Sequence, residues 1–138
     1  MVIRRNRPLV GPLLMAVGLI HVGLTPLLMG PSVRSVLAGG VVAASEADPE
    51  LAELRGLGFW YTTAGLAMIA YGWSITDRER QQQPLPAGLP VSLAALCAWG
   101  VVLMPKSPFW VFGVLAALAE VRRGSTHAVA ISPSRKRR

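Results

Sequence analysis

Cysteine and histidine are almost absent from this chain, which has one cysteine and two histidines among its 138 residues. A single thiol excludes disulfide bonds within the chain and metal sites made of several cysteines. Cys97 lies in an apolar run, where we expect a buried and unreactive thiol. His127, the one histidine that could join His21 in a metal site, falls in the polar C-terminal tail. We therefore expect no metal and no other cofactor.

Charged residues are also scarce. They make up 15% of the sequence, and hydrophobic residues make up 52%, whereas a soluble domain is about 25% charged. This balance predicts one compact membrane unit, with no room for a second domain. The net charge is +7, but the basic residues gather at the two ends of the chain and around Arg78 and Arg80, not along one stripe. We therefore expect no nucleic-acid partner.

Motifs for catalysis are missing as well. The sequence has no glycine-rich phosphate loop, no nucleophile with a neighbouring base and no pair of carboxylates. Glu120 is followed three residues later by Arg123, which can neutralise it on the surface of a helix. These absences favour a protein that is not an enzyme.

Four long apolar runs are present instead, and they predict an all-α, integral membrane four-helix bundle in residues 1–123. A helix needs about 20 apolar residues to cross the hydrocarbon core of a bilayer. The first two runs meet that length, and the last two fall short, so they either span where the bilayer thins or form a re-entrant pair. We favour spanning. The predicted spans are approximately 9–29, 56–76, 87–104 and 108–122.

The first two runs each carry a stripe of small or weakly polar residues at helical spacing, as packed membrane helices do. On the first run the stripe is Gly11, Leu14, Gly18, His21 and Thr25; on the second it is Gly56, Thr63, Ala67, Ala70 and Ser74. If the two helices are antiparallel neighbours, His21 lies beside Thr63 and Gly18 beside Ala67. A separate bulky stripe, Phe59, Leu66, Ile69 and Trp73, is expected to face lipid.

The segments between the runs have their own signals. Residues 32–45 resemble a short interfacial helix that is weakened by Gly39 and Gly40. Asp48 followed by Pro49 predicts the start of the second long helix. That helix is expected to end in water at residues 77–80. The basic tail, residues 124–138, is expected to be disordered and to lie on anionic lipid headgroups.

The positive charges predict an orientation. With four spans, one side of the membrane holds eleven basic residues and the other holds three, Arg34, Arg55 and Lys106. Because the cytoplasmic side carries the excess of Lys and Arg, both termini are predicted to be cytoplasmic. The predicted location is a bacterial plasma membrane, crossed several times.

His21 is the strongly titratable side chain that lies deepest within a predicted span, so it is the first candidate for a functional residue. Three interpretations remain open: a hydrogen bond to Thr63 that holds two helices together, a ligand pocket, or proton transfer. The candidate polar cluster or pocket consists of His21, Thr25, Trp60 and Thr63. Trp60 has its own alternative, as an aromatic anchor at the membrane interface.

Three segments, AVGLIHVGL, GFWYTTAGLAMIAYG and VVLMPKSPFW, together resemble an uncharacterised family of small bacterial four-helix membrane proteins, a domain of unknown function. The resemblance spans Leu9 to Val121 and implies fold and location, not activity.

Three functional hypotheses remain. The first is a non-enzymatic component that associates with itself or with another membrane protein through small faces on Gly65, Gly72, Gly113 and Ala117. The second is a protein that binds or modifies a lipid or a quinone-like molecule around His21. The third is a dimeric small transporter.

Overall fold

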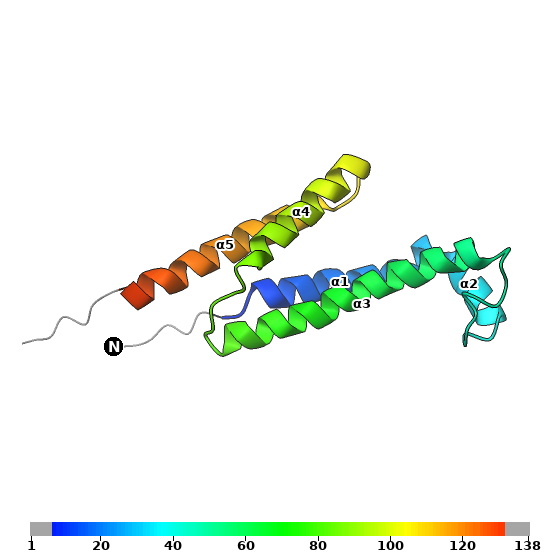
Figure 1. The fold of residues 1–138 in the computed structure, drawn as a ribbon, viewed down its shortest axis with the longest axis horizontal. Helices are drawn as coiled ribbons and strands as arrows, with labels where there is room; N and C mark the ends of the chain where they lie inside the picture. The colour runs from blue at the N-terminus through cyan, green and yellow to red at the C-terminus, as the bar shows by residue number, and fades with distance from the viewer. Residues whose placement is uncertain (1–6, 132–138) are drawn as a thin grey trace, which may run out of the picture. The chain divides into compact units, whose positions relative to one another are not determined.

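The computed structural model describes residues 7–131, with side chains placed through residue 124, and within that range the chain forms helices and no strands. The all-α prediction is confirmed (Figure 1), and the five helices of the described residues correspond to the four predicted apolar segments and the predicted short helix between the first two. They are α1 (Val10–Leu28), α2 (Gly30–Ala38), α3 (Ala52–Arg80), α4 (Gly88–Leu103) and α5 (Trp110–Ile131). The chain divides into two compact units, one of residues 12–74 and one of residues 1–11 with 75–138.

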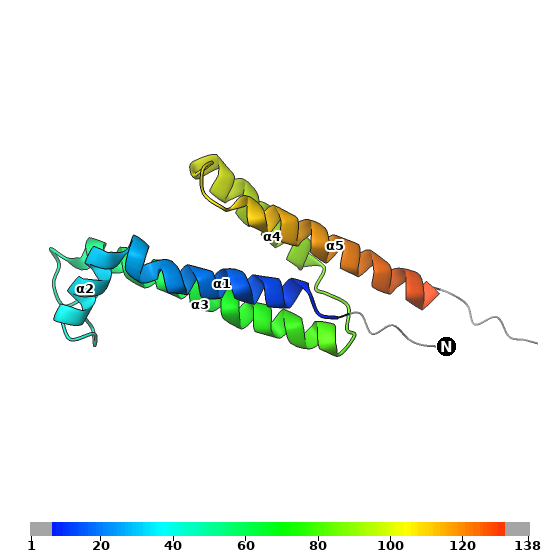
Figure 2. The same ribbon diagram turned by 180° about the vertical axis from the view of Figure 1, so that it is seen from behind.

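In the unit of residues 12–74, α1 and α3 run antiparallel and side by side, as both views show (Figures 1 and 2). Their contact is close because glycines meet at it. A Cβ added to Gly18 would lie 2.7 Å from the carbonyl oxygen of Gly65 and 2.9 Å from the backbone nitrogen of Ile69. Gly65 and Ile69 lie two residues on either side of Ala67, the predicted neighbour of Gly18, so the predicted depth is close to the observed one.

The buried face of α3 differs from the predicted stripe. Gly58, Gly65 and Gly72 are buried at intervals of seven residues, whereas Ala67 and Ser74 are exposed. A repeat of seven keeps one face of a helix turned toward a neighbour over several turns. The stripe predicted on α1 is confirmed, since Gly11, Leu14, Gly18 and Thr25 are buried and His21 is half-buried. The bulky stripe is largely exposed, as predicted, except that Ile69 is half-buried.

Between α1 and α3 the chain turns twice. Met29 separates α1 from α2, which begins at Gly30 with Pro31 in its first turn and ends at Ala38, with Gly39 as the residue that caps it. The predicted short helix therefore exists, but it is shorter than residues 32–45. Asp48 accepts a hydrogen bond at Oδ1 from the Glu50 N–H (3.0 Å). The helix α3 starts at Ala52, three residues after the predicted proline, and ends at Arg80.

In the second unit, α4 and α5 form an antiparallel pair (Figure 1). Gly100 is buried against the ring of Phe109, and a Cβ on Gly113 would lie 3.0 Å from the Sγ of Cys97. Cys97 is half-buried, which is less buried than predicted.

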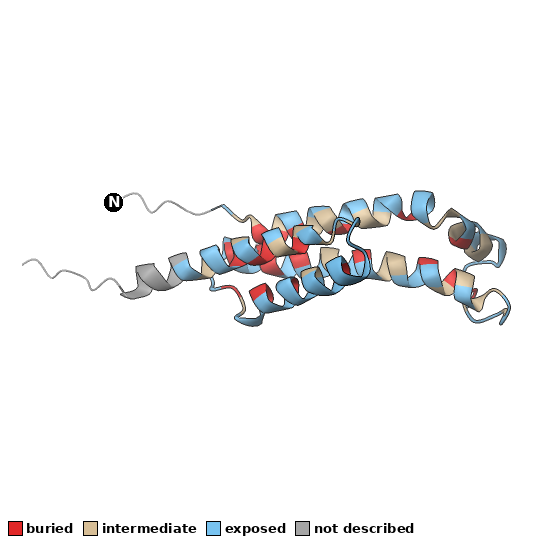
Figure 3. Cartoon of the chain, turned by 90° about the horizontal axis from the view of Figure 1, so that it is seen from above, coloured by how far each residue is buried: buried red, intermediate tan, exposed pale blue. Residues whose placement is uncertain are grey.

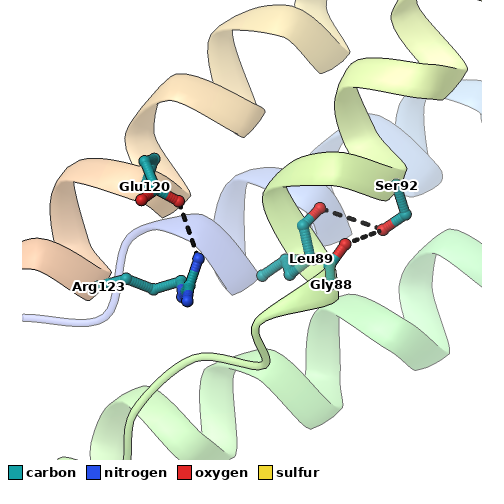
Figure 4. A network of polar contacts seen from close by, with 5 residues as sticks. All are labelled: Gly88, Leu89, Ser92, Glu120 and Arg123. Atoms are coloured by element: carbon teal, nitrogen blue, oxygen red, sulfur yellow. Dashed lines mark hydrogen bonds and ion pairs between the residues drawn. The ribbon is translucent and has the colours of Figure 1, made fainter.

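The predicted pairing of Glu120 with Arg123 is confirmed at 2.9 Å (Figure 4). The same figure shows Ser92, whose hydroxyl donates to the carbonyl oxygens of Gly88 and Leu89.

The prediction of four membrane spans is supported in part, and one expectation about the C-terminal tail is wrong. Within the described residues, α1 is the one helix that is both long and apolar enough to cross a membrane, and α4 is a shorter apolar helix. The helix α3 has the length, but glycine, threonine, tryptophan and tyrosine lower its mean hydropathy. The tail was expected to be disordered from residue 124 onward. That expectation is wrong for residues 124–131, because α5 continues to Ile131. The remainder of the predicted tail lies outside the described residues.

Candidate functional site

His21 stacks on Tyr61 across the contact of α1 and α3. The ring centroids are 3.8 Å apart and the ring planes differ by 15°. The Nε2 atom of His21 is buried and has no hydrogen-bond partner among the described residues. A buried polar atom without a partner is costly and rare in native proteins. The sequence predicted Thr63 opposite His21, and the structure places Tyr61 against the ring, two residues earlier on α3.

The other residues of the predicted cluster are only partly brought together. Thr25 lies one turn after His21 on α1 and donates its hydroxyl hydrogen to the carbonyl oxygen of His21 (3.3 Å). Thr63 is half-buried on α3. Trp60 is 70% exposed and packs edge-on against Phe59. Trp60 also lines an open pocket to which His21, Thr25 and Thr63 do not contribute.

Arg55 forms a second polar cluster, which the sequence did not predict. This residue is 6% exposed, although its side chain carries a positive charge. Nε–H donates to the hydroxyl of Ser35 (2.8 Å) and Nη1–H donates to the carbonyl oxygen of Ala44 (2.7 Å). The guanidinium therefore ties α3 to α2 and to the loop that follows α2. Its planar fork allows one side chain to reach both acceptors.

Ser32 extends this cluster along α3. Its hydroxyl donates to the carbonyl oxygen of Arg55 (3.4 Å) and accepts a hydrogen bond from the N–H of Gly58 (3.2 Å). Gly58 has no side chain, and a Cβ at this position would collide with Ser32 Oγ. The absence of a side chain therefore allows the hydroxyl to reach the backbone of α3.

Glu79 forms the third cluster, at the start of α1. The residue is 9% exposed, and its carboxylate accepts hydrogen bonds from the N–H groups of Leu9, Val10 and Gly11, at 3.0–3.1 Å. The first N–H groups of a helix have no partner within the helix, and a negative charge is stabilising beside them. The expectation that residues 77–80 end α3 in water is therefore wrong for Glu79. Asp77, Arg78 and Arg80 are exposed as expected.

The open pocket lies between the loop after α2 and the first turns of α3, within the unit of residues 12–74. Its volume is about 480 Å³. It is lined by Val41, Ala43, Ser45 and Glu46 from the loop and by Gly56, Phe59 and Trp60 from α3. Arg55 precedes Gly56 in the sequence and bonds Ala44, which lies between two of the loop residues that line the pocket.

The described residues contain no group of three or more His, Cys, Asp or Glu side chains that could hold a metal ion. The sequence offered few signals for the residues that were missed. Arg55 precedes an uncharged run and Glu79 lies within a charged run, so the sequence suggests that water surrounds both side chains. Most of their hydrogen-bond partners are backbone atoms that lie far away in the sequence.

Comparison with known proteins identifies a family. A family of unknown function, DUF6463, matches this chain over residues 5–126. No curated protein and no solved structure matches it. The match confirms the resemblance to an uncharacterised family that three segments of the sequence indicated.

Proposed function

This chain belongs to DUF6463, a family of unknown function, and on that premise we propose that it is a multi-pass integral membrane protein that serves as a non-enzymatic interaction subunit. Its location would be a bacterial plasma membrane, with both termini in the cytoplasm. Its partners would be a second copy or another membrane protein.

The proposal rests on the apolar side chains that the long helices expose. Exposed residues run along each of the long helices (Figure 3), and large apolar residues are among them on every one. In the most apolar 18-residue stretch of α1, only 28% is buried. A core helix of a soluble protein would bury most of such a stretch. The most exposed examples are Leu27 (79%), Trp73 (67%), Val102 (79%) and Val121 (67%). Large exposed apolar patches are rare on soluble monomers, whereas lipid tails are as apolar as leucine and can cover such side chains.

Spanning by α3 and by the α4–α5 pair is part of this proposal. The 56–76 segment of α3 carries no charge, and its aromatic residues near both ends suit the two membrane interfaces. The distribution of basic residues, eleven against three, then supports cytoplasmic termini.

Cysteine labelling in intact cells tests this topology. On a Cys97→Ala background we expect a membrane-impermeant maleimide to label Ala47→Cys in intact cells and Gln83→Cys only after lysis. Both positions are exposed in the structure, so access depends on the membrane. The chain should also stay in the pellet after alkaline carbonate extraction. Release by carbonate, or equal labelling of the two positions in intact cells, would overturn the proposal.

A second candidate function, a small-molecule pocket at His21, is favoured by the buried Nε2 atom without a partner. A ligand that forms a hydrogen bond with Nε2 would remove that cost. Native mass spectrometry of the gently extracted protein separates the two functions. The interaction subunit should carry a second copy or a partner protein and be unchanged in His21→Leu. A co-purifying small molecule that His21→Leu abolishes would establish the second candidate instead.

A further inference from the structure

We propose that the open pocket between residues 41–46 and the first turns of α3 binds an organic ammonium group, supplied by the headgroup of a phospholipid such as phosphatidylethanolamine. The inference deepens the proposed function and rests on the membrane location given there.

The charge of the pocket selects a cation. Glu46 is the charged residue that lines it, and no Lys or Arg side chain does so. Glu46 and the next residue, Ala47, are exposed, so the carboxylate is available to a ligand. This acidic pocket lies in a chain whose net charge is +7, and an anion would find better sites elsewhere on the surface.

Two aromatic rings add to that selection. Phe59 and Trp60 line the pocket and are 51% and 70% exposed, with ring centroids 5.1 Å apart. The face of an aromatic ring attracts an ammonium group, and tryptophan does so most strongly. A carboxylate beside aromatic faces thus matches a positively charged nitrogen that carries carbon substituents.

The size of the pocket and its surroundings suit a lipid. Its volume of about 480 Å³ lies within the range of roughly 300–1,000 Å³ that is usual for small-molecule sites. Further along α3, Leu66 and Trp73 are 54% and 67% exposed and continue the stripe that begins at Phe59. This apolar stripe provides a path for an acyl chain leaving the pocket, and Trp60 suits the headgroup level of a bilayer.

The loop that forms one wall is held in an unusual shape. Val41 and Ala43 have positive φ angles of 67° and 55°, which is uncommon for residues other than glycine and exceptional for valine. The bond from Arg55 to the carbonyl of Ala44, which is 1% exposed, fixes the loop between these positions and Glu46. Arg55 is therefore a positioning residue for the pocket. Strained backbone held by its surroundings is found often at ligand sites.

Lipid retention measured by native mass spectrometry tests the proposal. The protein is exchanged into micelles containing equal amounts of phosphatidylethanolamine and phosphatidylglycerol, and the two lipids that remain bound are counted. We expect Glu46→Gln to lower the ratio of bound ethanolamine lipid to bound glycerol lipid about threefold, as loss of one exposed ion pair implies. Trp60→Leu should lower it by a similar factor.

Glu53→Gln is the matched control, because it removes the same charge from an exposed position in the first turn of α3 outside the pocket. Its ratio should equal that of the wild type, and far-UV circular dichroism should show equal helix content in all variants.

Displacement of the lipid by excess free ethanolamine would support binding of the ammonium group alone, and resistance to displacement would support binding of the whole lipid. If Glu46→Gln and Glu53→Gln show equal ratios of bound ethanolamine lipid to bound glycerol lipid, the proposed lipid site is wrong, but the membrane location is unaffected. Release of the protein from the membrane by carbonate would instead overturn the membrane location, on which the lipid site depends.

Discussion

Glu79→Ala lowers the free energy of unfolding by about 2–4 kcal/mol, because it leaves the first N–H groups of α1 without an acceptor. The three donors, on Leu9, Val10 and Gly11, bond the carboxylate at 3.0–3.1 Å, and two of them are buried with it. Water reaches this end of α1 poorly and cannot replace the carboxylate fully. Thermal unfolding of the purified protein, followed by circular dichroism, measures the loss.

Two further variants show whether the carboxylate itself is responsible. Glu79→Gln keeps the shape but removes the charge and one acceptor oxygen, so it should lose roughly half as much stability. Glu120→Ala removes a glutamate that is exposed and bonded to Arg123 on its own helix, and its effect should stay below about 0.5 kcal/mol. If Glu79→Ala melts like Glu120→Ala, the carboxylate does not hold the start of α1.

The second large effect is expected at the contact of α1 and α3. Gly18→Val should destabilise the protein by about 2–3 kcal/mol, because an overpacked contact forces its neighbours apart. The colliding atoms are the carbonyl oxygen of Gly65 and the nitrogen and side chain of Ile69, at 2.7–2.9 Å from the added Cβ. Two of these are backbone atoms, so no change of rotamer relieves the collision.

Gly23→Val provides the control on the same helix. A Cβ at Gly23 would have no atom within 4 Å, so the change should cost less than about 0.5 kcal/mol, and the gain in helix propensity over glycine offsets part of it. The melting temperatures of the two variants in the same detergent give the comparison. Similar values for both would show that α1 and α3 do not meet at Gly18.

The sequence predicted the buried face of α1 but not that of α3, and the difference has a physical cause. On α1, the stripe that contains Gly18 is bordered by large apolar residues, so one face stands out. On α3, glycine, alanine, serine and threonine form several small stripes, and helical periodicity does not rank them. The backbones approach most closely where Cβ is absent, so Gly58, Gly65 and Gly72 prevail over Ala67 and Ser74.

The polar clusters were harder to predict than the packing. His21 was recognised because a titratable residue in an apolar run stands out, yet its partner is the ring of Tyr61 and not a hydrogen-bonding side chain. Glu79 and Arg55 were missed because most of their partners are backbone atoms. Every residue has such atoms, so no pattern of side chains marks which N–H or carbonyl a charged group will reach.

The bond between Glu79 and the start of α1 joins residues that are 70 positions apart. A ribosome adds the N-terminal residue first, so α1 is complete well before Glu79 is made. During that interval the first N–H groups of α1 lack this acceptor. Synthesis of the last turn of α3 therefore supplies the acceptor for the start of α1. A nascent chain that stops before residue 79 contains the α1 sequence and nearly all of the α3 sequence but lacks this bond.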